Sequence, residues 1–133
     1  MMGILRKKHF VIRIIFLIWI FIIAVLSLIP DQNINRNSPK GFISSGRGEM
    51  HFIIYFISAV LCYYAFKFKG ITFIFLSCFL VFFFGVILEV VQIWIPYRNF
   101  NPADIVANAF GIIAFVSIWS IFACFVGRKS SVD

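Results

Sequence analysis

The chain has 133 residues, of which 62% are hydrophobic and only 13% are charged, and 19 of them are phenylalanine. A soluble domain of this length needs far more polar surface, so the composition excludes a soluble globular protein and predicts an integral membrane protein. The formal net charge is +7, but the cations lie in short clusters between apolar segments. That distribution is typical of charge that flanks membrane spans, and it excludes a nucleic-acid-binding surface.

Four apolar segments are long enough to cross the hydrocarbon core as helices: residues 11–29, 50–66, 71–95 and 103–126. Pro30 closes the first segment, and a polar loop over residues 30–49 separates it from the second. Pro96 ends the third segment. The run Asn101-Pro102-Ala103-Asp104 has the residue types preferred at the N-cap, N1 and N3 positions, so the fourth helix is expected to begin there. The sequence therefore predicts an all-α, single-domain membrane protein with four transmembrane helices.

The distribution of lysine and arginine predicts the orientation in the membrane. The N-terminal segment, the link at residues 67–70 and the C-terminal tail together carry eight of these cations, whereas loop 30–49 and the link at 96–102 carry four. Short cytoplasmic loops are enriched in Lys and Arg, so both termini are expected in the cytoplasm and loop 30–49 outside. Leu28-Ile29-Pro30 is a poor signal-peptidase site, so the first segment is expected to remain as an uncleaved span.

With this topology, the unusual polar residues all fall at the outer ends of the predicted helices: His51 and Tyr55 in the second, Glu89 and Gln92 in the third, Arg98 in the following link, and Asp104 and Asn108 in the fourth. At about 1.5 Å of rise per residue, Glu89 lies roughly 10 Å below the end of its helix and Asn108 roughly 9 Å below the start of its own, so the two are expected at one level. Gly111 continues the face of Asn108 and is expected to let the third and fourth helices approach closely.

Each of these residues has a structural interpretation. Glu89 would hold neighbouring helices together through a hydrogen bond, and Asp104 would only cap a helix. Arg98 would anchor the interface by extending its charge toward lipid headgroups. His51, near a surface, would be an ordinary solvated histidine. Ionisable groups are costly in a bilayer, however, and their collection at one membrane face favours a functional site.

As a functional site, this corner offers limited chemistry. Arg98 has a fork suited to phosphate or carboxylate, while Glu89, His51 and Asp104 are candidate acid–base groups. The ligand pocket would be shaped by Gln92, Asn108 and Tyr55, with Gly111, Pro96 and Asn101 in structural roles. The cluster has a single histidine, and the three cysteines lie within apolar runs without metal-ligand spacing, so neither a metal nor a cofactor is expected.

The spacing of these residues resembles that of a known family. The pattern Glu89-x2-Gln92-x5-Arg98-x5-Asp104-x3-Asn108-x2-Gly111, preceded by His51-Phe52-x2-Tyr55, is similar to that of the VanZ family of small bacterial membrane proteins, and the resemblance covers residues 27–115. The family commonly has a lysine shortly before the histidine and a small residue four positions after the glycine. This chain has Arg47-Gly48-Glu49-Met50 and Phe115 there. The resemblance implies an accessory protein of the bacterial cell membrane, linked to resistance against the glycopeptide teicoplanin.

Three functions agree with these features. In the first, the outer polar site engages a membrane lipid, a lipid-linked cell-wall precursor or an amphiphilic lipoglycopeptide, with Arg98 holding an anionic group. In the second, an intramembrane enzyme modifies a headgroup with Glu89 or His51 as general base. In the third, the polar residues only hold together the helices of a membrane scaffold. Loss of function in alanine variants of Glu89 or Arg98, with the protein still in the membrane, separates the first from the third.

Overall fold

The computed structural model describes residues 2–29, 47–66, 71–96, 98 and 100–129, and this part of the chain contains four α-helices and no strand. The helices are α1 (Met2–Leu28), α2 (Arg47–Phe66), α3 (Ile71–Val91) and α4 (Pro102–Lys129), with a 3₁₀ turn η1 (Gln92–Trp94) after α3. All four are long and apolar enough to cross a membrane, which confirms the predicted all-α, multi-pass architecture. Of the loop predicted over residues 30–49, residues 30–46 lie outside the described residues, as does the link at 67–70. Residues 47–49 belong to α2, which therefore begins three residues before the predicted second span.

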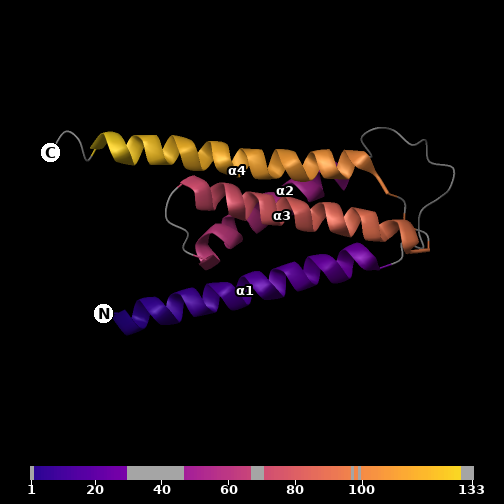
Figure 1. Cartoon of the computed structure of the whole chain (residues 1–133), viewed down its shortest axis with the longest axis horizontal. Helices are drawn as coiled ribbons and strands as arrows, with labels where there is room; N and C mark the ends of the chain where they lie inside the picture. The colour runs from indigo at the N-terminus through magenta and orange to yellow at the C-terminus, as the bar shows by residue number, and fades with distance from the viewer. Residues whose placement is uncertain (1, 30–46, 67–70, 97, 99, 130–133) are drawn as a thin grey trace.

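Helix α2 is the centre of the bundle because it packs against each of the other three helices, most extensively against α4. In Figure 1, α1 and α4 run along opposite edges of the molecule with α2 and α3 between them. The start of α1 and the end of α4 lie at the same end of the bundle. This is the arrangement expected of a chain that crosses a membrane four times.

The interior of the bundle is lined by small side chains of α2. Ala59, Cys62 and Ala65 of this helix are at most 1% exposed, and side chains of this size let neighbouring backbones approach closely. Ile74 of α3 and Phe115 of α4 fill the space that remains. Many other phenylalanines, such as Phe79 and Phe122, are exposed, as expected for helices whose surroundings are lipid rather than water.

Two glycines mark the closest helix contacts. A Cβ at Gly111 of α4 would lie 3.0 Å from the backbone nitrogen of Phe56 and closer still to the carbonyl oxygen of Phe52, both on α2. The close approach predicted at Gly111 is therefore real, but it joins α4 to α2 rather than to α3. Gly85 of α3 meets α2 in a similar way, because a Cβ there would lie 2.5 Å from the ring of Tyr55.

The end of α3 is shaped by Pro96. The α-helix stops at Val91, and the Ile95 N–H donates to the Gln92 carbonyl at 3.1 Å, a tighter 3₁₀-type bond. Ile95 itself is extended, with φ −95° and ψ 124°. A residue that precedes proline is pushed into this region by the proline ring. The last turn of the predicted third span is thus a 3₁₀ turn, which brings the chain across to α4.

Candidate functional site

The start of α4 is fixed by Asn101, which acts as the predicted N-cap. Its side-chain oxygen accepts a hydrogen bond from the Ala103 N–H at 3.2 Å, and its side-chain nitrogen donates to Asp104 Oδ1 at 3.1 Å. Asparagine is among the best residues for this position because it satisfies backbone donors that the first helical turn leaves without partners. The cap also fixes the Asp104 carboxylate, which is 2% exposed and lies inside the bundle rather than at its surface.

The first turns of α2 bring two basic side chains to Asp104. Arg47 Nε lies 3.3 Å from Asp104 Oδ2, and His51 Nε2 lies 3.8 Å from the same oxygen. The other ring nitrogen of His51 is 3.0 Å from Asn108 Oδ1, one turn further along α4. The side chains of Arg47 and His51 are 32% and 22% exposed, whereas that of Asp104 is 3% exposed. The basic groups therefore form the accessible edge of a site whose acid is buried.

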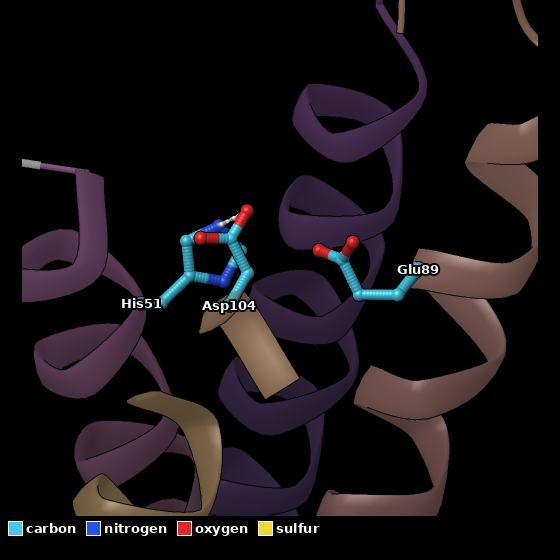
Figure 2. Close-up of side chains that lie close together, drawn as sticks. All are labelled: His51, Glu89 and Asp104. Atoms are coloured by element: carbon cyan, nitrogen blue, oxygen red, sulfur yellow. Dashed lines mark ion pairs between the residues drawn. The ribbon is translucent and has the colours of Figure 1, made fainter. Parts of the chain in front are cut away.

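Glu89, in the last full turn of α3, completes the cluster. It is 2% exposed, and its carboxylate is directed toward Asp104 and His51 (Figure 2). One ligand-type atom from each of these three residues lies within 4.8 Å of the other two. Three helices thus contribute one side chain each to a single point. From the rise per residue, Glu89 is expected at the level of Asn108. In the structure Asn108 bonds to His51, and the carboxylate near Glu89 is that of Asp104.

Tyr55 lies one helical turn after His51 on α2 and stacks against its ring. Its ring is nearly parallel to that of His51, with ring centroids 6.4 Å apart and an angle of 5° between the planes. Tyr55 is itself 3% exposed and is held against Gly85. It therefore contacts the cluster as a stacked neighbour that limits where the imidazole can lie.

Gln92 and Arg98 contact α1 instead of the cluster. Gln92 donates a hydrogen bond to Ser27 Oγ at 2.6 Å. The Arg98 guanidinium donates from Nε to the Ile29 carbonyl and from Nη2 to the Leu26 carbonyl, each at 3.0 Å. These are carbonyls at the C-terminal end of α1, where helical carbonyls have no intrahelical partner. The structure thus gives Arg98 the geometry of a helix cap.

The arginine at the cluster is Arg47, which the sequence argument did not select. A signal for it was present, because Arg47 precedes His51 by one helical turn and the two share a face. Arg47 also supplies a cation shortly before the histidine, where the resembled pattern has lysine. Ser27 was missed for a different reason: its partner Gln92 is far away in sequence, and no local spacing connects them.

The cluster is chemically unbalanced in one respect. Within the described part of the chain, Glu89 Oε2 and Asp104 Oδ2 are buried and accept no hydrogen bond, although the latter has the ion pair to Arg47. Buried polar atoms in folded proteins nearly always have partners. A group of unpartnered acceptors beside an arginine can hold a proton, a cation or a hydrogen-bonding ligand.

Comparison of the chain with protein-family models, with curated proteins and with solved structures finds no match.

Proposed function

We propose that this chain is a VanZ-like protein of the bacterial cell membrane that binds the anionic headgroup of a membrane lipid or lipid-linked cell-wall precursor, and so contributes to teicoplanin resistance or envelope homeostasis. The observation that carries this proposal is the exposed edge formed by Arg47 and His51 above the buried Asp104. An arginine fork presents five N–H donors, and the contact to Asp104 uses Nε. Phosphate and carboxylate groups match the geometry of such a fork.

The placement of this edge supports a headgroup as the ligand. Arg47 and Asp104 belong to the first turns of α2 and α4, so the edge lies at one end of the bundle, at the level of a membrane interface. The excess of Lys and Arg at the opposite end favours an orientation with the cluster outside and both termini in the cytoplasm. In that orientation the edge meets the outer leaflet, where lipid-linked wall precursors are used.

A groove between α3 and α4 supports a ligand with an apolar tail. It has a volume of about 310 Å³ and is lined by apolar side chains that include Phe79, Phe82 and Ile113. Ala109 and Ile112 of the same lining are within one turn of Asn108, whereas on α3 the lining residue nearest to Glu89 is Phe82, roughly 10 Å deeper along the helix. A headgroup at Arg47 and an acyl or polyprenyl chain in this groove would use both surfaces.

Retention of lipid tests the proposal. Purified protein in a neutral detergent is incubated with phosphatidylglycerol and phosphatidylcholine of identical chains, and bound lipid is measured by native mass spectrometry. Wild type should retain the anionic lipid preferentially, and Arg47→Ala should lose that preference. The matched control is Arg13→Ala, because Arg13 contacts the Ala65 carbonyl at the other end of α2 with the same Nε geometry, at 3.0 Å.

Two results would contradict headgroup binding at this edge: an unchanged preference in Arg47→Ala, or an equal loss in Arg13→Ala. The same variants, expressed at equal membrane levels in a teicoplanin-susceptible Gram-positive host, link binding to phenotype. Resistance conferred by wild type and by Arg13→Ala but not by Arg47→Ala is the expected pattern. Reduced amounts of inserted protein in the Arg47 variant would instead favour a purely structural role for the cluster.

The orientation of His51 favours a second candidate, an enzyme that modifies the headgroup. Asn108 holds one ring nitrogen, so the other faces the two carboxylates. A histidine held in this way is suited to act as a general base through Nε2, with Asn108 orienting the ring. Protein incubated with envelope lipids should then form a product that is missing with His51→Gln and Glu89→Gln. An unchanged lipid profile in wild type would eliminate this candidate and leave the binding proposal intact.

A further inference from the structure

Three atoms that accept hydrogen bonds converge at the cluster, and they come from three different helices. They are a ring nitrogen of His51, an oxygen of Asp104 and an oxygen of Glu89, all within 4.8 Å of one another (Figure 2). Carboxylate and imidazole side chains gathered in this way usually repel each other unless a proton or a cation lies among them. A proton or a cation is therefore expected among them.

The carboxylates are buried and incompletely paired. Glu89 and Asp104 are each 2% exposed, and within the described residues Glu89 Oε2 and Asp104 Oδ2 accept no hydrogen bond. The other oxygen of Asp104 accepts from the Asn101 side chain at 3.1 Å, so the oxygen that faces the cluster is Oδ2, which forms the ion pair with Arg47 at 3.3 Å. One arginine beside two buried carboxylates leaves their charge incompletely compensated, and coordination of a metal ion is one of the ways in which proteins compensate buried charge.

The His51 ring is oriented as that of a metal-binding histidine would be. Asn108 Oδ1 can only accept a hydrogen bond, so the contact at 3.0 Å requires the proton of His51 on Nδ1. In the neutral ring, Nε2 then presents a lone pair toward Asp104 Oδ2, at 3.8 Å. Metal-bound histidines almost always have this arrangement, in which one ring nitrogen donates to a carbonyl or carboxylate and the other binds the ion.

We propose that His51, Glu89 and Asp104 bind a divalent transition-metal ion of the zinc class, with one nitrogen and two oxygen ligands. Zinc accepts this donor set at about 2.0–2.2 Å per bond, so ligand atoms around it lie roughly 3.4 Å apart. His51 Nε2 and Asp104 Oδ2, 3.8 Å apart, exceed this separation by only about 0.4 Å. The three ligand atoms all lie within 4.8 Å of one another, so small side-chain rotations bring them to the distances that zinc requires. Three protein ligands leave a fourth coordination position for water or another ligand, as in catalytic rather than structural zinc sites.

Arg47 is the internal competitor of such an ion. Its guanidinium lies 3.3 Å from Asp104 Oδ2, and a second cation at the same oxygen is repelled by it. Removal of this charge should therefore strengthen metal binding. The headgroup proposal predicts the opposite for lipid, because Arg47→Ala should lose anionic lipid. The metal site does not depend on the proposed function, and the two can fail separately.

Metal binding is measured on the full chain in a neutral detergent, carrying an affinity tag without histidine and stripped with EDTA. Wild type dialysed against Zn²⁺ should retain about one ion per chain by elemental analysis, and Co²⁺ in its place should give a visible ligand-field absorption band that EDTA removes. His51→Ala, Glu89→Gln and Asp104→Asn should each weaken Zn²⁺ binding more than about 100-fold, beyond the 10–100-fold that loss of an outer-shell partner causes. Arg47→Ala should bind more tightly than wild type.

The chain provides a matched control in its second histidine, His9 of α1, whose variant His9→Ala should bind Zn²⁺ as wild type does. Glu89→Gln and Asp104→Asn preserve side-chain shape, and helical circular dichroism with size-exclusion chromatography identifies any variant that fails to fold. The Co²⁺ spectrum of wild type needs no variant. Absence of that band, stoichiometric binding that survives all three ligand substitutions, or equal losses with His9→Ala would overturn the proposal.

Discussion

A single methyl group added at Gly111 should move α2 away from α4 without changing any residue of the polar cluster that these helices carry. In Gly111→Ala, the new Cβ would lie 3.0 Å from the Phe56 nitrogen and 3.1 Å from the Phe52 carbonyl carbon, and closer to the Phe52 oxygen. Ordinary van der Waals contact begins at 3.4 Å, and all three neighbours are backbone atoms of α2 that cannot rotate away. Helices α2 and α4 must therefore move apart by several tenths of an ångström or more.

The expected cost follows from this overlap. Overpacking of a well-filled contact destabilises a protein by about 1–3 kcal/mol. For a chain of this length, 1 kcal/mol corresponds to roughly 3–5 °C in Tm, so the variant should unfold about 3–15 °C below wild type. Because α2 carries Arg47 and His51 while α4 carries Asp104 and Asn108, the same movement should weaken Co²⁺ binding.

A second glycine of the same interface serves as the control. A Cβ at Gly48 of α2 would meet Ala107 at 4.0 Å, which is an ordinary contact. Alanine favours helix over glycine by up to about 1 kcal/mol, so Gly48→Ala should unfold at or above the wild-type temperature. Unfolding followed by circular dichroism in detergent compares the three proteins. A Gly111→Ala protein as stable as Gly48→Ala would refute the close α2–α4 approach on which the site geometry rests.

Three further substitutions test contacts at the same end of the bundle, each by Tm in detergent. Arg98→Ala removes two hydrogen bonds to carbonyls at the C-terminal end of α1 and should lower stability by about 1–2 kcal/mol without changing Zn²⁺ affinity. A loss of Zn²⁺ affinity with an unchanged Tm would instead place Arg98 in the polar cluster. Ser27→Ala leaves the buried Gln92 amide without its acceptor and should lower stability by about 1–3 kcal/mol. Adding Gln92→Leu to that variant should recover most of the lost stability, and no recovery would mean that the two residues are not coupled. Asn101→Ala removes the α4 cap and should lower stability by about 1 kcal/mol, whereas Asn101→Ser should retain most of the wild-type stability. An Asn101→Ala protein as stable as Asn101→Ser would contradict the capping role.

The fold was predictable because lipid imposes a simple rule on the sequence. Each long apolar run must form a helix, and proline and polar residues mark where it ends. The start of α4 was also predictable, since Asn101, Pro102 and Asp104 act through contacts within one turn. The end of the third span near Ile95 was predictable in position but not in form, because the 3₁₀ turn that follows α3 depends on how Pro96 redirects the chain.

The candidate site was predictable in its depth but not in its pairings. Rise per residue places Glu89, Asp104 and Asn108 near one end of the membrane. It does not say how each helix is rotated about its axis, and these helices are apolar on nearly every face, so periodicity does not identify the face that is buried. Gly111 was therefore matched to the wrong neighbour, and Arg98 was expected at a cluster where the structure has Arg47.

The polar cluster and the helix bundle are parts of one equilibrium. Glu89, Asp104 and His51 come from three separate helices, so the cluster exists only when α2, α3 and α4 are assembled. When the helices separate, two carboxylates and an arginine enter lipid without one another, which is costly for each of them. The cluster therefore favours the assembled state even without a ligand. A ligand that binds only the assembled state adds to this, by about 2.7 kcal/mol at a concentration 100 times its dissociation constant. The incomplete pairing of the two buried carboxylates is thus a local cost that the assembled bundle tolerates, and a bound cation or headgroup would convert it into additional stability.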